Sequence, residues 1–174
     1  MKPFALMSNG LETIRNFAQV SAEEEKMLLS IQKPIVVLNL TEAGKKLADI
    51  VAPDQNTLGF MLPYTPLHYL LLEKEINYPE VLVMTSGNLS EEPIVTENEE
   101  ALEKLQGIAD AFLMHNRPIE TRIDDSVLTT VADKPYFIRR ARSFAPSPLR
   151  LPFFTTQAFA AGTHLKNTFA LSRE

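Results

Sequence analysis

Short apolar runs recur along this chain, and segments with helical spacing separate them. A run of four or five apolar residues without alternation is typical of a strand covered on both faces of a sheet. Apolar segments predict strands near residues 1–7, 34–38, 58–62, 81–85 and 111–114. Residues 127–131 and 136–140 are predicted to be a pair of strands joined by a polar turn. Apolar residues at helical spacing predict helices near residues 11–18, 21–29, 67–72 and 96–105. The alternation predicts an α/β fold with a largely covered, mixed sheet.

Three of these helices have recognisable start signals. Ser21 and Thr96 each stand three residues before a glutamate, the spacing of a capping box. Thr65 precedes a proline, which needs no N–H at the first helical position. A polar stretch that contains Gly44 and the pair Lys45-Lys46 is expected to lead from the strand near 34–38 to the strand near 58–62.

The absence of cysteine and the negative charge exclude several classes of function. Without cysteine there is no disulfide framework, no thiolate zinc or iron–sulfur site and no cysteine nucleophile. A net charge of −5 argues against bulk electrostatic binding to nucleic acid or to an anionic membrane. The sequence has no apolar stretch of the ~20 residues that a membrane span needs, and we expect a cytoplasmic protein.

The segment Thr85-Ser86-Gly87-Asn88 follows a predicted buried strand. Ligands of open α/β sheets bind beyond strand ends, and hydroxyl, amide and backbone N–H groups suit phosphate oxygens. The structural alternative is a plain turn held by bonds from asparagine to the backbone. Both interpretations stay open.

Two charged segments are the next candidates for a site. Asp124 and Asp125 precede Ser126, a set that could hold Mg²⁺ or could simply face water or pair with an arginine. Arginines at 139, 140 and 142 form a cationic run in an acidic chain, which suits phosphate or carboxylate. A solvated edge strand explains the same run equally well.

The three histidines, His68, His115 and His164, lack the spacing of a histidine metal site, and we predict no metal site in this chain. His68 lies in a predicted apolar helix, where a packing residue with satisfied polar atoms is expected. His115 lies at a predicted strand end beside Asn116 and Arg117, which makes it a candidate site residue.

Seven segments, in order along the chain, resemble the HypF family of carbamoyltransferases, in the part of those proteins called the YrdC-like domain. They are residues 2–7, 52–53, 58–68, 84–93, 115–119, 124–127 and 139–142. Residues 162–169 are similar to the start of the Kae1-like domain that follows it. The resemblance implies a YrdC-like fold, an open twisted mixed sheet with flanking helices, over residues 1–144, without its first strands. A proline-rich linker is expected over 145–156, and the start of a Kae1-like carbamoyltransferase domain over 157–174.

The HypF family uses carbamoyl phosphate and ATP with Mg²⁺ to form carbamoyl-adenylate. The carbamoyl group passes to HypE and becomes a cyanide ligand in the maturation of nickel–iron hydrogenases. The resemblance assigns nucleotide or phosphate binding to Lys2, Ser86, Asn88, Ser126 and Arg139. His115, Asp125 and Arg140 are additional candidates. Zinc is implied only for family regions that this chain does not contain.

Two other functions are compatible with these motifs. Stand-alone threonylcarbamoyl-adenylate synthases of tRNA modification share the Ser-x-Asn motif, but they do not continue from the arginine run into a tail like 162–168. YrdC-like domains are also linked to double-stranded RNA, which the acidic charge disfavours.

The chain departs from the HypF pattern at two positions and in its extent. Glu91 and Ser143 stand where the family usually has glycine. The acylphosphatase domain and zinc fingers of the family, and most of its Kae1-like domain, are not in this sequence. We therefore expect this stretch alone to be inactive and to bind nucleotide weakly or not at all.

Overall fold

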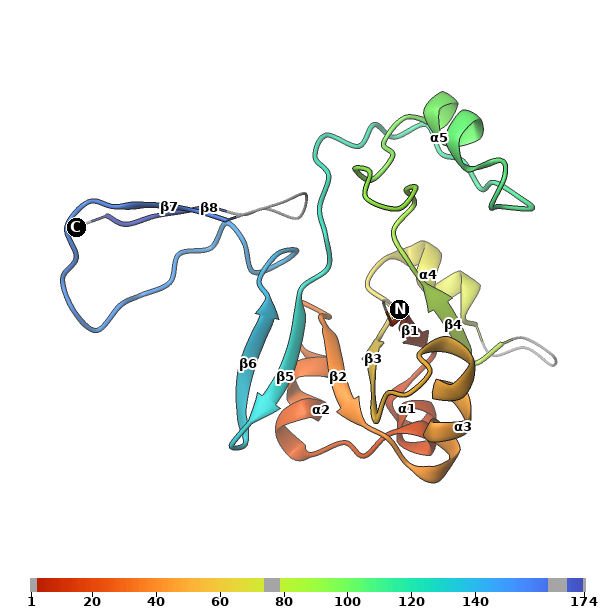
Figure 1. The fold of residues 1–174 in the computed structure, drawn as a ribbon, viewed down its shortest axis with the longest axis horizontal. Helices are drawn as coiled ribbons and strands as arrows, with labels where there is room; N and C mark the ends of the chain where they lie inside the picture. Colours follow the sequence, from red (N-terminus) through yellow and green to blue (C-terminus); the bar gives the residue numbers. More distant parts are fainter. Residues whose placement is uncertain (1–2, 74–78, 163–168, 174) are drawn as a thin grey trace. The chain divides into compact units, whose positions relative to one another are not determined.

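Two units make up the chain in this computed structural model, which describes residues 3–73, 79–162 and 169–173. The first unit comprises Met1–Thr85 and Asp125–Pro146, and the second comprises Ser86–Asp124 and Ser147–Glu174. Each unit is described by itself below (Figure 1). Lys2 and His164, considered above, lie outside the described residues.

The first unit is built on a six-stranded mixed sheet in the order β4-β1-β3-β2-β5-β6. β1 is parallel to β3, β2 is parallel to β5, and the other neighbours are antiparallel, so the predicted mixed sheet is confirmed. The edge strands are β4 and β6. The bounds are β1 Ala5–Ser8, β2 Ile35–Asn39, β3 Thr57–Met61, β4 Val81–Met84, β5 Val127–Val131 and β6 Lys134–Arg139.

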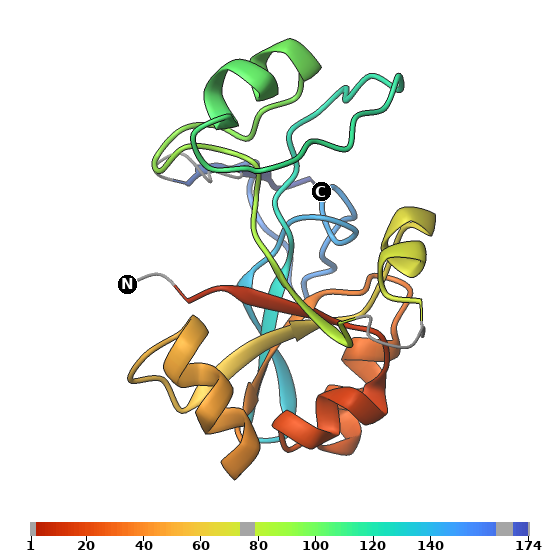
Figure 2. The ribbon, with the colours of Figure 1, turned by 90° about the vertical axis from the view of Figure 1, so that its right-hand side faces the viewer.

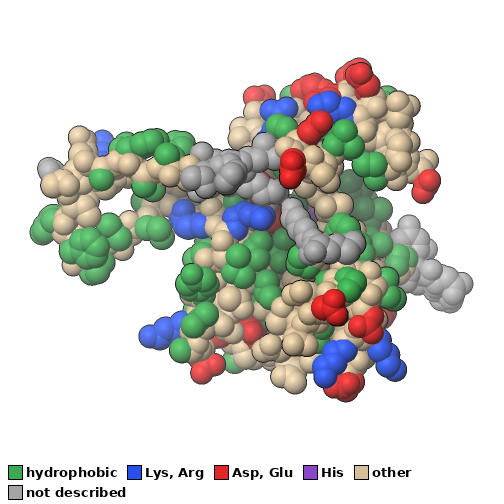
Figure 3. Space-filling view, viewed as in Figure 1, with side chains coloured by type: hydrophobic (Ala, Val, Ile, Leu, Met, Phe, Trp, Pro, Cys, Tyr) green, Lys and Arg blue, Asp and Glu red, His purple; other side chains and the backbone are tan. Residues whose placement is uncertain are grey.

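Three helices cover one face of this sheet: α1 (Leu11–Phe17), α2 (Ala22–Leu29) and α3 (Glu42–Val51). In both ribbon views α1 and α3 lie beside one another (Figures 1 and 2). Their apolar residues bury the sheet side chains that alternate onto this face, including the fully buried Phe60. Lys45 and Glu42 of α3 form an ion pair at 2.7 Å. Figure 3 shows charged side chains on the surface of the first unit.

The opposite face of the sheet holds a smaller apolar cluster around Met7, Met61 and Leu72. Leu72 caps α4 (Pro66–Leu71), and Tyr64 from the preceding loop packs against the same cluster. α4 begins as predicted, because the Thr65 hydroxyl accepts from the His68 amide at 3.3 Å and proline occupies the first turn.

The capping box predicted for α2 is confirmed, and it also ties the helix to the sheet. The Ser21 hydroxyl accepts from the Glu24 amide, and the Glu24 carboxylate accepts from the Ser21 amide at 2.8 Å. The second Glu24 oxygen accepts from the Thr130 hydroxyl of β5 at 2.9 Å. A buried carboxylate is thus satisfied by its own helix and by a strand.

Three local predictions are wrong. The polar stretch around Gly44 is the helix α3, capped by Thr41, because Gly44, Ala48 and Val51 form a buried stripe at helical spacing. The second capping box does not form, since α5 (Asn98–Leu105) starts one residue later with Glu97 at the N-cap and no side-chain cap bond. Residues 111–114 are not a strand; they have no sheet partner among the described residues, and most of their side chains are exposed.

The second unit contains α5 and a two-stranded sheet. β7 (Phe159–Ala161) pairs antiparallel with β8 (Phe169–Leu171), and the Ser172 hydroxyl accepts from the Ala158 amide at 2.7 Å. Residues 147–158 contain neither helix nor strand.

Candidate functional site

The predicted site residues fall into the two units. Asp125, Ser126, Arg139 and Arg140 belong to the first unit, and they lie where β5 begins and β6 ends. Ser86, Asn88 and His115 belong to the second unit. Each set is built up separately.

Ser126 is buried and joins the start of β5 to the segment after β6. Its hydroxyl accepts from the Ala141 amide at 2.8 Å and donates to the Arg142 carbonyl at 2.9 Å. Its own carbonyl accepts from the Ile35 amide at 2.9 Å. The hydroxyl therefore fixes the path of the chain through the arginine run, whatever else it contacts.

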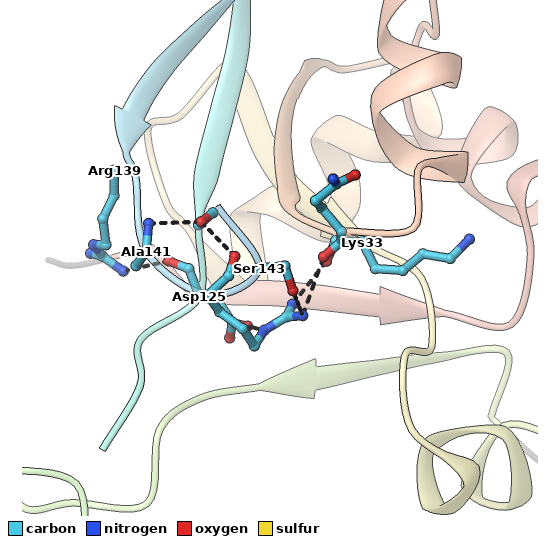
Figure 4. Close-up of polar contacts among 8 residues, drawn as sticks. Lys33, Asp125, Arg139, Ala141 and Ser143 are labelled. Carbon is cyan, nitrogen blue, oxygen red and sulfur yellow. Dashed lines mark hydrogen bonds and ion pairs between the residues drawn. The ribbon is translucent and has the colours of Figure 1, made fainter. Parts of the chain in front are cut away.

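Arg142 donates hydrogen bonds to several segments of the first unit. Figure 4 shows the polar contacts of this region, with Lys33, Asp125, Arg139, Ala141 and Ser143 labelled. The Arg142 Nε donates to the Asp125 carboxylate at 2.7 Å, with the two side chains only 16% and 29% exposed. Its Nη atoms donate to the carbonyl oxygens of Gln32 and Lys33 at 3.2 and 2.9 Å, and to the Ser143 hydroxyl. Of the two sequence interpretations of Asp125, pairing with an arginine is the one the structure contains.

Tyr64 and His68 extend this cluster away from Arg142. The Arg142 guanidinium stacks 3.6 Å from the centroid of the Tyr64 ring, and the His68 ring meets Tyr64 edge-on at 4.5 Å. The pKa of His68 is lowered, mainly by burial. The Asp125 carboxylate acts to raise this pKa, and the Arg142 guanidinium acts to lower it further. Burial and Asp125 raise the pKa of Tyr64. Neither Tyr64 nor His68 is among the site residues predicted from the sequence.

The expectation that His68 has satisfied polar atoms is wrong in one respect. Its Nδ1 is buried and has no hydrogen-bond partner among the residues that the structure describes. Packing against Tyr64 orients the ring without providing a donor or an acceptor for this atom.

Arg139 and Arg140 are half-buried at the end of β6. The Nη1 of Arg139 donates to the Asp125 carbonyl at 3.3 Å, so this guanidinium lies beside the same loop as Arg142. β6 is an edge strand, which the structural interpretation of the arginine run also predicts. Phosphate binding by Arg139 and Arg140 stays a prediction.

In the second unit, Asn88 closes the turn that follows Thr85. The Ser86 hydroxyl donates to the Asn88 side-chain oxygen. The Asn88 amide nitrogen donates to the carbonyl oxygens of Leu89 and Glu92 at 2.7 and 3.1 Å. These are the bonds of the asparagine turn considered above, and phosphate binding by this turn stays a prediction.

His115 is exposed, and its carbonyl oxygen and its ring are held by neighbours in the second unit. The carbonyl accepts from the Asn98 side chain at 2.9 Å, and the ring Nδ1 accepts from the Arg117 amide at 3.2 Å.

Within the described parts of the chain, no group of three His, Asp or Glu side chains is arranged to hold a metal ion. No helix in the same parts has the length and apolar character to cross a membrane.

Glu91 and Ser143, which stand at usual glycine positions, both have left-handed backbone, with φ of 66° and 67°. This region costs a residue with a Cβ about 1 kcal/mol. We expect Ser143→Gly and Glu91→Gly each to raise the free energy of unfolding by about 0.5 kcal/mol, measured by urea unfolding. Ser147→Gly, outside left-handed backbone, is the control and should not stabilise; equal effects at all three positions would contradict this explanation.

A family model of the Sua5/YciO/YrdC type, described as "Telomere recombination", matches residues 1–141. The probable carbamoyltransferase HypF of Methanocaldococcus jannaschii is 47% identical over 150 residues, which are 86% of this chain and 19% of that protein. The carbamoyltransferase HypF of Synechocystis sp. is 45% identical over 174 residues, which are 99% of this chain and 22% of that protein.

A solved structure described as full-length HypF in the phosphate- and nucleotide-bound form has a TM-score of 0.84 at 50% identity. The match covers 99% of this chain and 27% of that one. The chain spans about a fifth of the length of the two curated relatives.

Proposed function

Because the chain belongs to the Sua5/YciO/YrdC family, and its relatives are HypF carbamoyltransferases, we propose that it is the adenylate-forming part of a HypF-type carbamoyltransferase. One observation carries the proposal: similarity at 45% and 50% identity extends over nearly the whole chain, to proteins named HypF, one of which holds phosphate and nucleotide. The substrates would be carbamoyl phosphate and ATP. The carbamoyl acceptor would be HypE, and the compartment the cytoplasm.

The reaction joins carbamate to the α-phosphorus of ATP. Carbamate is the carboxylate that carbamoyl phosphate yields when its phosphate is released to water. A carbamate oxygen forms a bond to phosphorus as the bond to pyrophosphate breaks, and negative charge grows on the phosphate oxygens. Fixed cations and N–H donors around these oxygens lower the barrier. We assign this role to Arg139 and Arg140 in the first unit and, separately, to the Ser86–Asn88 turn in the second.

The Asp125 carboxylate, a sequence candidate for Mg²⁺, is paired with Arg142. We infer that the Mg²⁺ of the reaction would enter with the phosphates of ATP. Lys2 and His115 keep their phosphate assignment as predictions only.

The proposal predicts that Arg139→Ala and Asn88→Ala each reduce carbamoyl-phosphate-dependent ATP–pyrophosphate exchange at least tenfold in the full-length protein. Tenfold corresponds to about 1.4 kcal/mol of transition-state stabilisation. Arg139→Ala removes a positive charge that would stabilise the negative charge growing on the phosphate oxygens. Asn88→Ala removes the three side-chain hydrogen bonds that shape the turn.

Arg15→Ala is the matched control, because Arg15 is an exposed arginine of α1 whose two ion pairs are with Glu12 of the same helix and Glu25 of α2. This variant should exchange at the wild-type rate. Wild-type rates in both site variants would overturn the residue assignment, and no exchange by the wild-type protein would overturn the function itself.

A further inference from the structure

Four side chains from separate segments of the first unit form a row. Asp125 pairs with Arg142, the Arg142 guanidinium stacks on Tyr64, and Tyr64 meets the His68 ring edge-on. The row starts at the carboxylate of Asp125, whose backbone carbonyl accepts from Arg139. It therefore begins in the loop to which phosphate binding is assigned, and it ends at His68.

The row contains charged groups but has no net charge. Asp125 and Arg142 neutralise each other at 2.7 Å. Burial favours the neutral forms of both His68 and Tyr64. Arg142 already donates to four acceptors, the Asp125 carboxylate, two carbonyls and the Ser143 hydroxyl. A neutral polar group is therefore a better ligand for this row than a phosphate, which the arginines at the end of β6 suit better.

The buried Nδ1 of His68 lacks a hydrogen-bond partner among the described residues. Buried polar atoms are nearly always paired, and leaving one unpaired costs about 1–3 kcal/mol. The Thr65 cap fixes the backbone at the start of α4, and the His68 ring packs edge-on against Tyr64. The atom is thus positioned for a small hydrogen-bonding group that comes from outside the described residues.

We propose that His68 determines specificity for the carbamoyl group, with its Nδ1 hydrogen-bonding the carbamoyl amide of the substrate. The inference rests on the proposed function. A carbamoyl group is small, planar and rich in hydrogen-bonding atoms, and a neutral imidazole can pair with it without an added charge. Tyr64 and Arg142 act as positioning residues for His68, and Arg142 does not bind the substrate.

The test uses three variants of the full-length protein in the exchange assay, with the KM for carbamoyl phosphate and for ATP measured separately. His68→Leu keeps the approximate volume but removes the ring nitrogens. It should raise the KM for carbamoyl phosphate about tenfold and leave the KM for ATP unchanged. His68→Asn places a polar atom near the position of Nδ1 and should recover much of the loss, whereas His68→Gln, which reaches further, should not.

Leu70→Ala, at an exposed position of the same helix, is the control and should leave both KM values unchanged. Wild-type KM values in His68→Leu would overturn the inference, and so would a rise in the KM for ATP alone or an equal rise in both. Recovery by Gln but not Asn would assign the contact to Nε2 and overturn the role of Nδ1. Absence of exchange in the wild-type protein would instead overturn the proposed function.

Discussion

Replacement of Arg142 by alanine is expected to lower the free energy of unfolding by about 3 kcal/mol. The substitution leaves the partly buried Asp125 carboxylate without its cation. It also removes the donors to the Gln32 and Lys33 carbonyls and the stacking on Tyr64. These partners lie in three segments, just before β2, just before β5 and in the loop after β3. The substitution therefore removes the side chain that holds these three segments together. Urea unfolding of the chain, followed by circular dichroism, measures the change.

Two variants test whether this effect comes from the bonds of the guanidinium or from its charge. Arg142→Lys keeps the charge but cannot reach the carboxylate and both carbonyls with one planar group, and an intermediate loss is expected. Arg15→Ala removes an arginine that also contacts two carboxylates, at 2.6 and 2.7 Å, but whose side chain is 38% exposed. Exposed pairs contribute little, so its effect should be much smaller. Equal losses in Arg15→Ala and Arg142→Ala would contradict the central role of Arg142.

Most of the sheet could be predicted from the sequence because its strands are marked locally. β2, β3 and β4 are apolar runs without alternation, and each lies within one or two residues of its predicted position. The starts of α2 and α4 were predictable for the same reason, since a cap is a contact between residues three apart. In this chain, local sequence patterns are therefore sufficient to predict these strands and helix starts.

The same local reasoning fails where a signal has two outcomes. Thr96 and Glu99 have capping-box spacing, yet the helix starts after Glu97, so spacing alone did not decide which residue caps it. Residues 111–114 are as apolar as the true strands, but they lie in the second unit, where no strand among the described residues pairs with them. A strand depends on a neighbour, and a single segment does not reveal one.

The charged residues of the site could be predicted from the sequence, but the contacts between them could not. The arginine run and Asp125 are unusual in an acidic chain and stand out in the sequence. That Arg142 binds Asp125 and stacks on Tyr64 depends on segments about 17 and 78 residues away, which only the sheet order brings together. The sequence places His68 in an apolar helix, and nothing local indicates its contact with Tyr64.

Gly44 explains why α3 was missed, and its replacement by alanine is expected to lower the free energy of unfolding by about 3 kcal/mol. Glycine disfavours a helix interior, and alanine is better there by about 1 kcal/mol, so an isolated helix would gain from the change. Here a Cβ at position 44 would overlap the Phe17 carbonyl oxygen and would lie 2.9 Å from the Phe17 carbonyl carbon. Both are backbone atoms, so no side-chain rotation relieves the overlap.

The start of α3 would have to move away from the end of α1 by more than an ångström, and two bonds would weaken. The Thr41 amide donates to the Phe17 carbonyl at 2.9 Å, and the Thr41 hydroxyl donates to the Asn16 carbonyl at 2.9 Å. Urea unfolding again measures the loss, with Gly10→Ala as the matched control. Gly10 has extended backbone with φ −175° and no atom within 4 Å of an added Cβ, so its change should stay below about 1 kcal/mol. A Gly44→Ala protein at least as stable as the wild type would mean that helix propensity outweighs the contact between α1 and α3, and would contradict this packing of the two helices.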